Sequence, residues 1–130
     1  MSNSEQIKLT LPVNAAYVSA ARLTASSVAN RLNFDIEEIE DIKVAVSEAC
    51  TYIIKNPCFS SKDNFKIEFN MAKDSIKINL SVESDKEVEI DDDEMSLRVI
   101  TALMNNTNID YDGKFFNMTI EKKHVQVSFN

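Results

Sequence analysis

The sequence predicts an α/β (α+β) fold, a two-layer sandwich in which three helices cover one face of a mostly antiparallel, mixed sheet of about five strands. Two observations predict this class. Segments in which apolar residues alternate with period two are interspersed with segments in which they recur at helical spacing. The strand segments are polar on one side only, so one layer of helices is sufficient to cover the apolar side of the sheet.

The N-terminal half predicts one strand and two helices. Apolar and polar residues alternate over 7–11, as expected for a half-buried strand. Asn14 can then cap a helix that runs to about residue 32, and Asp35 can cap a second helix. The second helix carries an apolar stripe to about residue 56, where a proline prevents further continuation.

The middle of the chain predicts a hairpin and a third helix. Two stretches of near-ideal alternation, 65–71 and 76–82, flank the turn sequence AKDS. The acidic run DKEVEIDDDE follows at 85–94 and leads into a helix with apolar residues from Met95 to Met104. The negative charges of the last aspartates in this run are expected to stabilise the N-terminus of that helix.

The C-terminal part predicts a closing hairpin. The segment DYDGK is typical of a turn, and two further strands are expected at 116–120 and 125–129. No repeat, linker or low-complexity segment divides the sequence, so we expect a single domain over residues 1–130.

Charge and composition narrow the function. The formal net charge is −7. It disfavours direct nucleic-acid binding, because neutralising phosphates requires clustered Lys and Arg. The same charge suits a protein partner that is basic. No apolar run approaches the ~18 residues of a membrane span, and the N-terminus lacks the apolar region of a signal peptide, so a cytoplasmic location is expected. Two cysteines and one histidine are too few for a zinc site, and no metal site is expected.

The glycine content restricts function most. The chain has one glycine, Gly113. Loops that cradle phosphates use several glycines, because the backbone must approach the phosphate oxygens closely. The composition therefore disfavours a glycine-rich nucleotide site.

Two adjacent stretches resemble a known family. ARLTASSVANRLNF at 21–34, followed by IEEIEDIKVAVSEACT at 36–51, is similar to the anti-sigma-factor serine kinases of the RsbW and SpoIIAB type, in the GHKL superfamily of ATPases. The resemblance is close over about residues 7–56 and looser beyond. It implies a GHKL (Bergerat-like) fold, and a bacterial regulator that binds a sigma factor and uses Mg-ATP to phosphorylate a serine of an antagonist protein.

The first nucleotide motif of that family departs from its pattern here. The motif is a glutamate, three residues and an asparagine on the second helix, where the glutamate serves as base and the asparagine binds Mg²⁺. Glu48 matches the glutamate, but Tyr52 stands at the asparagine position, and a phenol is a poor ligand for Mg²⁺. Asn56 lies one turn further, about 6 Å along the axis, too far to substitute without remodelling.

The other two motifs depart as well. The best match to the family's aspartate-x-glycine-x-glycine motif is SVESD at 81–85, where Val82 replaces the adenine-reading aspartate and Ser84 a glycine. The glycine-rich lid is absent, and the acidic run stands in its place, where its carboxylates would repel a triphosphate. If ATP bound nonetheless, its site would be lined by Glu48, Tyr52, Asn56 and Glu83.

These departures predict a regulator that has kept its docking helices and lost ATP. We expect a binding module with no cofactor, in which Glu48 is a vestigial base. It would contact a sigma factor, an anti-anti-sigma antagonist, or both, and form a homodimer. Arg22 is the expected partner-binding residue, because the family places an arginine of its first helix in the docking surface. The alternatives are an active protein-serine kinase with a rearranged Mg-ATP site, and a subunit that regulates an intact paralogue.

Several side chains also have plainer interpretations. Glu48 can be a solvated surface carboxylate, and the ring of Tyr52 is expected to fill the vacated pocket. Cys50 lies on the apolar stripe and is expected to act as a small hydrophobic residue, and Cys58 lacks the basic surroundings of a reactive thiol. His124, beside the sequence EKK, is expected to be exposed.

Overall fold

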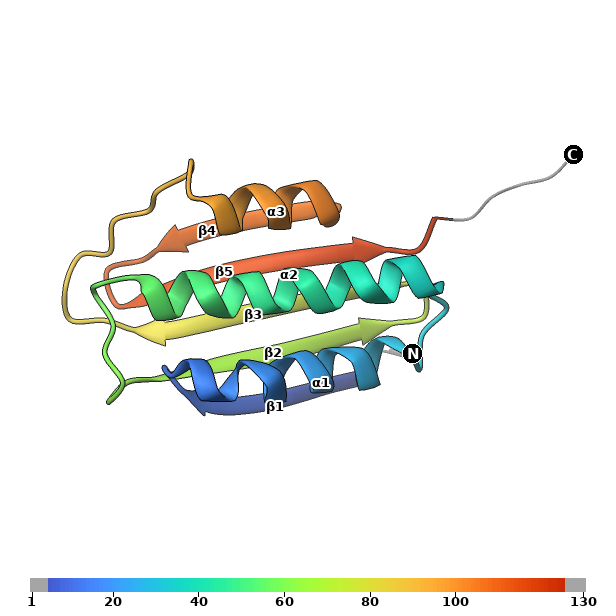
Figure 1. Cartoon of the computed structure of the whole chain (residues 1–130), viewed down its shortest axis with the longest axis horizontal. Coiled ribbons are helices and arrows are strands. Elements are labelled where there is room, and N and C mark those ends of the chain that lie inside the picture. The colour runs from blue at the N-terminus through green and yellow to red at the C-terminus, as the bar shows by residue number, and fades with distance from the viewer. Residues whose placement is uncertain (1–4, 126–130) are drawn as a thin grey trace, which may run out of the picture.

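The computed structural model describes residues 5–125 and has the predicted two-layer architecture (Figure 1). Three helices lie on one face of a five-stranded sheet: α1 (Val18–Ala29), α2 (Ile36–Lys55) and α3 (Met95–Leu103). A short 3-10 helix, η1 (Ala15–Tyr17), precedes α1. In Figure 1, α2 runs along the middle of the sheet, with α1 and α3 on either side of it.

The sheet has the strand order β1-β2-β3-β5-β4. Its strands are β1 (Glu5–Pro12), β2 (Asn64–Ala72), β3 (Ser75–Glu83), β4 (Asn106–Tyr111) and β5 (Phe115–Lys123). All four neighbouring pairs are antiparallel, so the sheet is not mixed. Within residues 5–125, β1 and β4 are the two edge strands.

The alternation of β2 and β3 builds the centre of the core. Phe65, Ile67 and Phe69 of β2 are fully buried and face the helices, and their partners across the strand pair are equally apolar. Burying a side chain of this size contributes roughly 1.5–3 kcal/mol. The intervening residues of both strands are polar and lie on the open face of the sheet.

Both predicted helix caps are present. Asp35 caps α2 with a complete capping box: its carboxylate accepts from the backbone amide of Glu38, and the Glu38 carboxylate accepts from the backbone amide of Asp35. The side chain of Asn14 accepts from the backbone amide of Ala16 and begins η1 rather than α1 itself. Capping satisfies backbone amides that have no partner within a helix.

The C-terminal part differs from the sequence-based prediction. The strand β4 was not predicted, and the turn DYDGK joins β4 to β5, with Gly113 at a φ of +96°. The closing hairpin is therefore formed by β4 and β5. Val125, the start of the predicted strand 125–129, is not in a strand, and the rest of that segment lies outside the described residues.

Two smaller predictions also needed correction. The helix expected to reach about residue 32 ends at Ala29. His124 is half-buried rather than exposed, with Nδ1 2.7 Å from Oε1 of Glu38. A separate observation concerns the membrane. Over residues 5–125, no helix combines the length and apolarity that crossing a membrane requires.

Candidate functional site

The residues of the first nucleotide motif lie along the C-terminal half of α2 and its cap. Glu48 is half-buried in the helix, Tyr52 follows one turn later, and Asn56 is the C-cap residue. A spacing of four places such residues on one side of a helix. Their surroundings, however, give each of them a separate role.

Tyr52 is part of the core. Its side chain is only 5% exposed, and its ring stacks on Phe116 of β5 with centroids 5.9 Å apart. The hydroxyl accepts a hydrogen bond from the backbone amide of Asp91 at 3.3 Å. Burial raises the pKa of the phenol, and the nearby carboxylates of Asp91, Glu94 and Asp92 raise it further. The hydrogen bond from the Asp91 amide lowers it by less. The hydroxyl is therefore held neutral, which suits a structural contact better than metal binding.

Asn56 is engaged locally. Its backbone has left the helical conformation, and its side-chain Oδ1 accepts from the backbone amide of Cys58 at 2.9 Å. This contact closes the turn through Pro57 that ends α2. The carbonyl oxygen that a magnesium ion would need is thus occupied by the protein's own backbone.

Residues 85–94, which we call the acidic strap, cross from the end of β3 to the start of α3. Three buried or half-buried residues hold it in place: Ser84 at its entry, and Val88 and Ile90 within it. Cys58 Sγ donates to the backbone carbonyl of Glu87 at 3.5 Å, and Asp91 contacts Tyr52 as described above. Two hydrogen bonds therefore tie the strap to Tyr52 in α2 and to Cys58 just beyond it, and the apolar residues of the strap pack against the core.

Between the strap and the end of α2 lies a cavity of about 380 Å³. It is lined by Tyr52, Lys55, Asn56, Pro57, Cys58, Glu87, Glu89, Asp91 and Glu94. Four of these residues are acidic and one is basic. Glu48 is not among them. A polyphosphate placed here would face a surplus of like charge, which destabilises binding.

The residues present do not fit Mg-ATP, the cofactor that the family resemblance implies. At the position of the metal-binding asparagine, a buried ring packs in the core. At the position of the adenine-reading aspartate, Val82 is 1% exposed and faces Phe65 and Phe116 across its neighbouring strands. Magnesium sites in proteins are built from carboxylate, carbonyl and water oxygens and from substrate phosphates. The Tyr52 hydroxyl instead accepts a hydrogen bond from the protein backbone, and Val82 has no side-chain oxygen.

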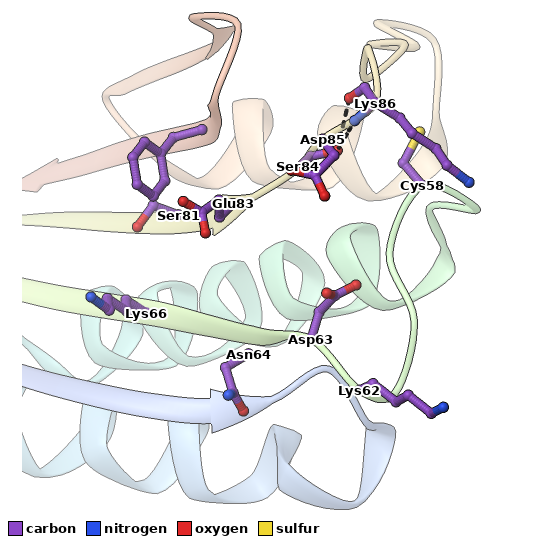
Figure 2. A pocket seen from close by; sticks show the side chains of 11 residues that line it. Cys58, Lys62, Asp63, Asn64, Lys66, Ser81, Glu83, Ser84, Asp85 and Lys86 are labelled. Carbon is purple, nitrogen blue, oxygen red and sulfur yellow. Dashed lines mark hydrogen bonds between the residues drawn. The ribbon is translucent and has the colours of Figure 1, made fainter.

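Glu83 lies in a different place from the other three candidate residues. Its carboxylate is at the exposed end of β3, 3.8 Å from Nζ of Lys114. It lines a separate cavity of about 540 Å³ at the ends of β2 and β3, shown in Figure 2. That cavity contains three lysines (Lys62, Lys66 and Lys86) and three acidic residues (Asp63, Glu83 and Asp85), so its charges balance.

Arg22 is exposed on α1, on the side away from the core. The buried side of α1 consists of small residues and one valine: Ala21, Ala25, Val28 and Ala29. Next to Arg22, Leu23 is 69% exposed, and Tyr17 in η1 is 42% exposed. Exposed arginine and tyrosine side chains are frequent anchors of protein-binding surfaces.

Comparison with known proteins identifies relatives. Residues 11–120 match the family model described as the histidine kinase-like ATPase domain. Curated relatives named serine-protein kinase RsbW, from Bacillus cereus and Bacillus thuringiensis, are 38% identical over 78 residues, which is 60% of this chain and 49% of theirs. The chain spans about half the length of these relatives.

A solved structure shares the fold. The crystal structure of the RsbU and RsbW domains of a Mycobacterium tuberculosis protein superposes with a TM-score of 0.72 at 15% identity. The superposition covers 92% of this chain and 32% of that one. The two-layer arrangement of helices on an antiparallel sheet is thus an established architecture.

Proposed function

Since the chain belongs to the histidine kinase-like ATPase domain family, we propose that it acts as an anti-sigma-type binding module that docks a protein partner without using ATP. The observation that carries this proposal is the contact between Tyr52 and the acidic strap. The metal-ligand position is filled by a core ring, and its hydroxyl holds the segment that stands where a glycine-rich lid would be. Glu48 is then a vestigial base, because phosphoryl transfer depends on positioning and charge stabilisation that the site lacks.

The docking surface of this proposal is the exposed side of η1 and α1, with Arg22, Leu23 and Tyr17. A partner helix or loop with an acidic residue would pair with Arg22, and an apolar recess would take Leu23. The resemblance to RsbW points to a sigma factor or an anti-anti-sigma protein as the partner, in a partner-switching pathway. A cytoplasmic homodimer is part of the same proposal.

Alanine substitutions test the docking surface. We expect Arg22→Ala and Leu23→Ala each to weaken binding to the cognate partner at least tenfold, because central arginine and apolar anchors dominate such interfaces. Arg31→Ala is the matched control, since Arg31 is also exposed but lies beyond the end of α1. The measurement is equilibrium binding to each sigma factor and anti-anti-sigma protein of the source cell. Unchanged affinity in both α1 variants would show that the docking surface lies elsewhere.

The second candidate is an active protein-serine kinase. The name of the matched relatives and the retained Glu48 favour it. It predicts transfer of labelled phosphate from Mg-ATP to a serine of the antagonist, and loss of that transfer in Glu48→Gln. The binding-module proposal predicts no transfer with either protein.

A further inference from the structure

The end of β5 is fastened to the start of α2 by contacts outside both the proposed docking surface and the acidic cavity. His124 Nδ1 lies 2.7 Å from Oε1 of Glu38, and the backbone amide of Val125 donates to Oε2 of Glu38 at 3.0 Å. Two consecutive residues therefore engage both oxygens of one carboxylate. Glu38 is 7% exposed, and a charge this buried needs such partners to remain ionised.

The same carboxylate also begins α2. Oε1 of Glu38 accepts from the backbone amide of Asp35 at 2.9 Å, and the backbone amide of Glu38 donates to Oδ1 of Asp35 at 2.8 Å. A negative charge in the first turn is further favoured by the helix dipole. The start of α2 and the end of β5 thus depend on one side chain.

Two further segments, the β2–β3 turn and the α1–α2 loop, contact His124 or each other at this place. The backbone amide of His124 donates to the carbonyl of Asp74, in the turn between β2 and β3, at 2.8 Å. The Asp74 side chain accepts from Asn33 at 2.9 Å, in the loop between α1 and α2. The ring of Phe34, in the same loop, meets the His124 ring edge-on at 6.5 Å.

We propose that Glu38 and His124 form a proton-controlled clasp, which holds the α1–α2 corner and the end of β5 together when His124 is charged and loosens when it is neutral. The charged groups that face His124 are carboxylates from two elements: Glu38 and Asp35 at the start of α2, and Asp74 in the β2–β3 turn. The neighbouring Lys122 instead points to Asp41, 3.1 Å away. All three carboxylates favour the imidazolium, and the two lysines that adjoin Asp74 and His124 in the chain, Lys73 and Lys123, have exposed side chains.

The direction of the pH dependence follows from both partners. The hydrogen bond to Glu38 raises the pKa of His124 above its ordinary value of 6.5, against a smaller opposing effect of burial. Its stabilising contribution is therefore complete below pH 6.5 and is lost as pH rises through the folded-state pKa. Burial raises the pKa of Glu38, but the hydrogen bonds from Asp35, His124 and Val125 together lower it below 4.5. Its contribution is complete above pH 4.5 and is lost as pH falls further, so the clasp is strongest between pH 4.5 and 6.5.

The chain offers an unusually direct test, because His124 is its only histidine. An NMR titration of the imidazole in the whole chain should give a pKa above 6.5. We expect Glu38→Gln to move this pKa down toward the ordinary value. Glutamine keeps the helix start intact, because Gln also serves in a capping box. Glu37→Gln, one residue away on the exposed side of α2, is the matched control and should leave the pKa unchanged.

Hydrogen exchange adds a readout of the clasp itself. Above the measured pKa of His124, the amide of Val125 should exchange faster than the intrinsic pH dependence predicts, and His124→Gln should remove this excess. A pKa at or below 6.5 in the unmodified chain, or one that Glu38→Gln leaves in place, would overturn the clasp. A raised pKa of His124 without faster exchange of the Val125 amide would contradict the proposal that the clasp loosens when His124 is neutral.

Discussion

The ring of Tyr52 stacks on the ring of Phe116 with an interplanar angle of 21°, and so joins α2 to β5 at the place where the family carries a metal ligand. We expect Tyr52→Ala to lower the free energy of unfolding by about 3–5 kcal/mol, the range for losing a buried aromatic ring. Tyr52→Phe keeps the ring and loses one hydrogen bond, so it should lower it by only about 0.5–1.5 kcal/mol. Urea denaturation measures both. Equal losses in the two variants would contradict a packing role for the ring.

The Lys122 ammonium ties three elements together. Nζ lies 3.1 Å from Oδ2 of Asp41 in α2 and donates to the carbonyl of Leu103 at the end of α3, while the lysine itself is in β5. Its side chain is 13% exposed. Lys122→Met should lower the free energy of unfolding by about 1–3 kcal/mol, because the Leu103 carbonyl and the Asp41 carboxylate lose a charged partner.

Lys123 supplies the control for that prediction. It is the next residue of β5 and its side chain is exposed, so Lys123→Met should change the free energy of unfolding by no more than about 0.5 kcal/mol. The two variants remove the same charge from the same strand. Similar losses in denaturation experiments would mean that net charge, rather than this contact, is responsible.

The two cysteines should react at very different rates. Burial raises the pKa of the Cys50 thiol to about 12, so at pH 8 almost none of it is the reactive thiolate. Cys58 is half-buried at the rim of both cavities. A thiol reagent should therefore label one cysteine per native chain and the second only after unfolding. Cys58→Ser should abolish the native reaction, and fast labelling that survives this substitution would contradict the burial of Cys50.

The clasp also makes a prediction about stability. The free energy of unfolding of the unmodified chain should exceed that of His124→Gln most clearly between pH 4.5 and 6.5. The difference should shrink as pH rises through the folded-state pKa of His124, because the imidazolium is lost there. Denaturation of both proteins at several pH values measures it. A difference that stays constant across this range would indicate packing alone.

The sequence predicted the parts of the fold in which local pattern and tertiary environment agree. The alternation of β2 and β3 and the apolar stripe of α2 are both complete, and the structure places them as expected. The strand β4 was missed because NTNIDY contains two asparagines and an aspartate, and is only half-buried at an edge of the sheet. Asparagine has a low strand propensity, and an edge strand buries too little to show a clear pattern.

The candidate site was predictable only in part, because the contacts that build it join residues far apart in the sequence. The substitution of Tyr52 for an asparagine can be read from the helix itself, and the acidic strap from composition. The contacts that give these features their roles are long-range: Tyr52 meets Asp91 39 residues away, and Glu38 meets His124 86 residues away. No local pattern marks such pairs, and His124 in particular follows a run of charged residues that suggested exposure.

We propose that this fold does not bind Mg-ATP, and thermal unfolding with and without the nucleotide distinguishes this proposal from the kinase. A ligand at 100 times its dissociation constant stabilises the folded state by about 2.7 kcal/mol, which would raise the Tm of a domain of this size by several degrees. We expect the melting curves with and without millimolar Mg-ATP to coincide, while a relative with intact nucleotide motifs shifts under the same conditions. A clear rise in the Tm of this chain with Mg-ATP, whether or not Glu48→Gln retains it, would contradict this proposal and favour the kinase.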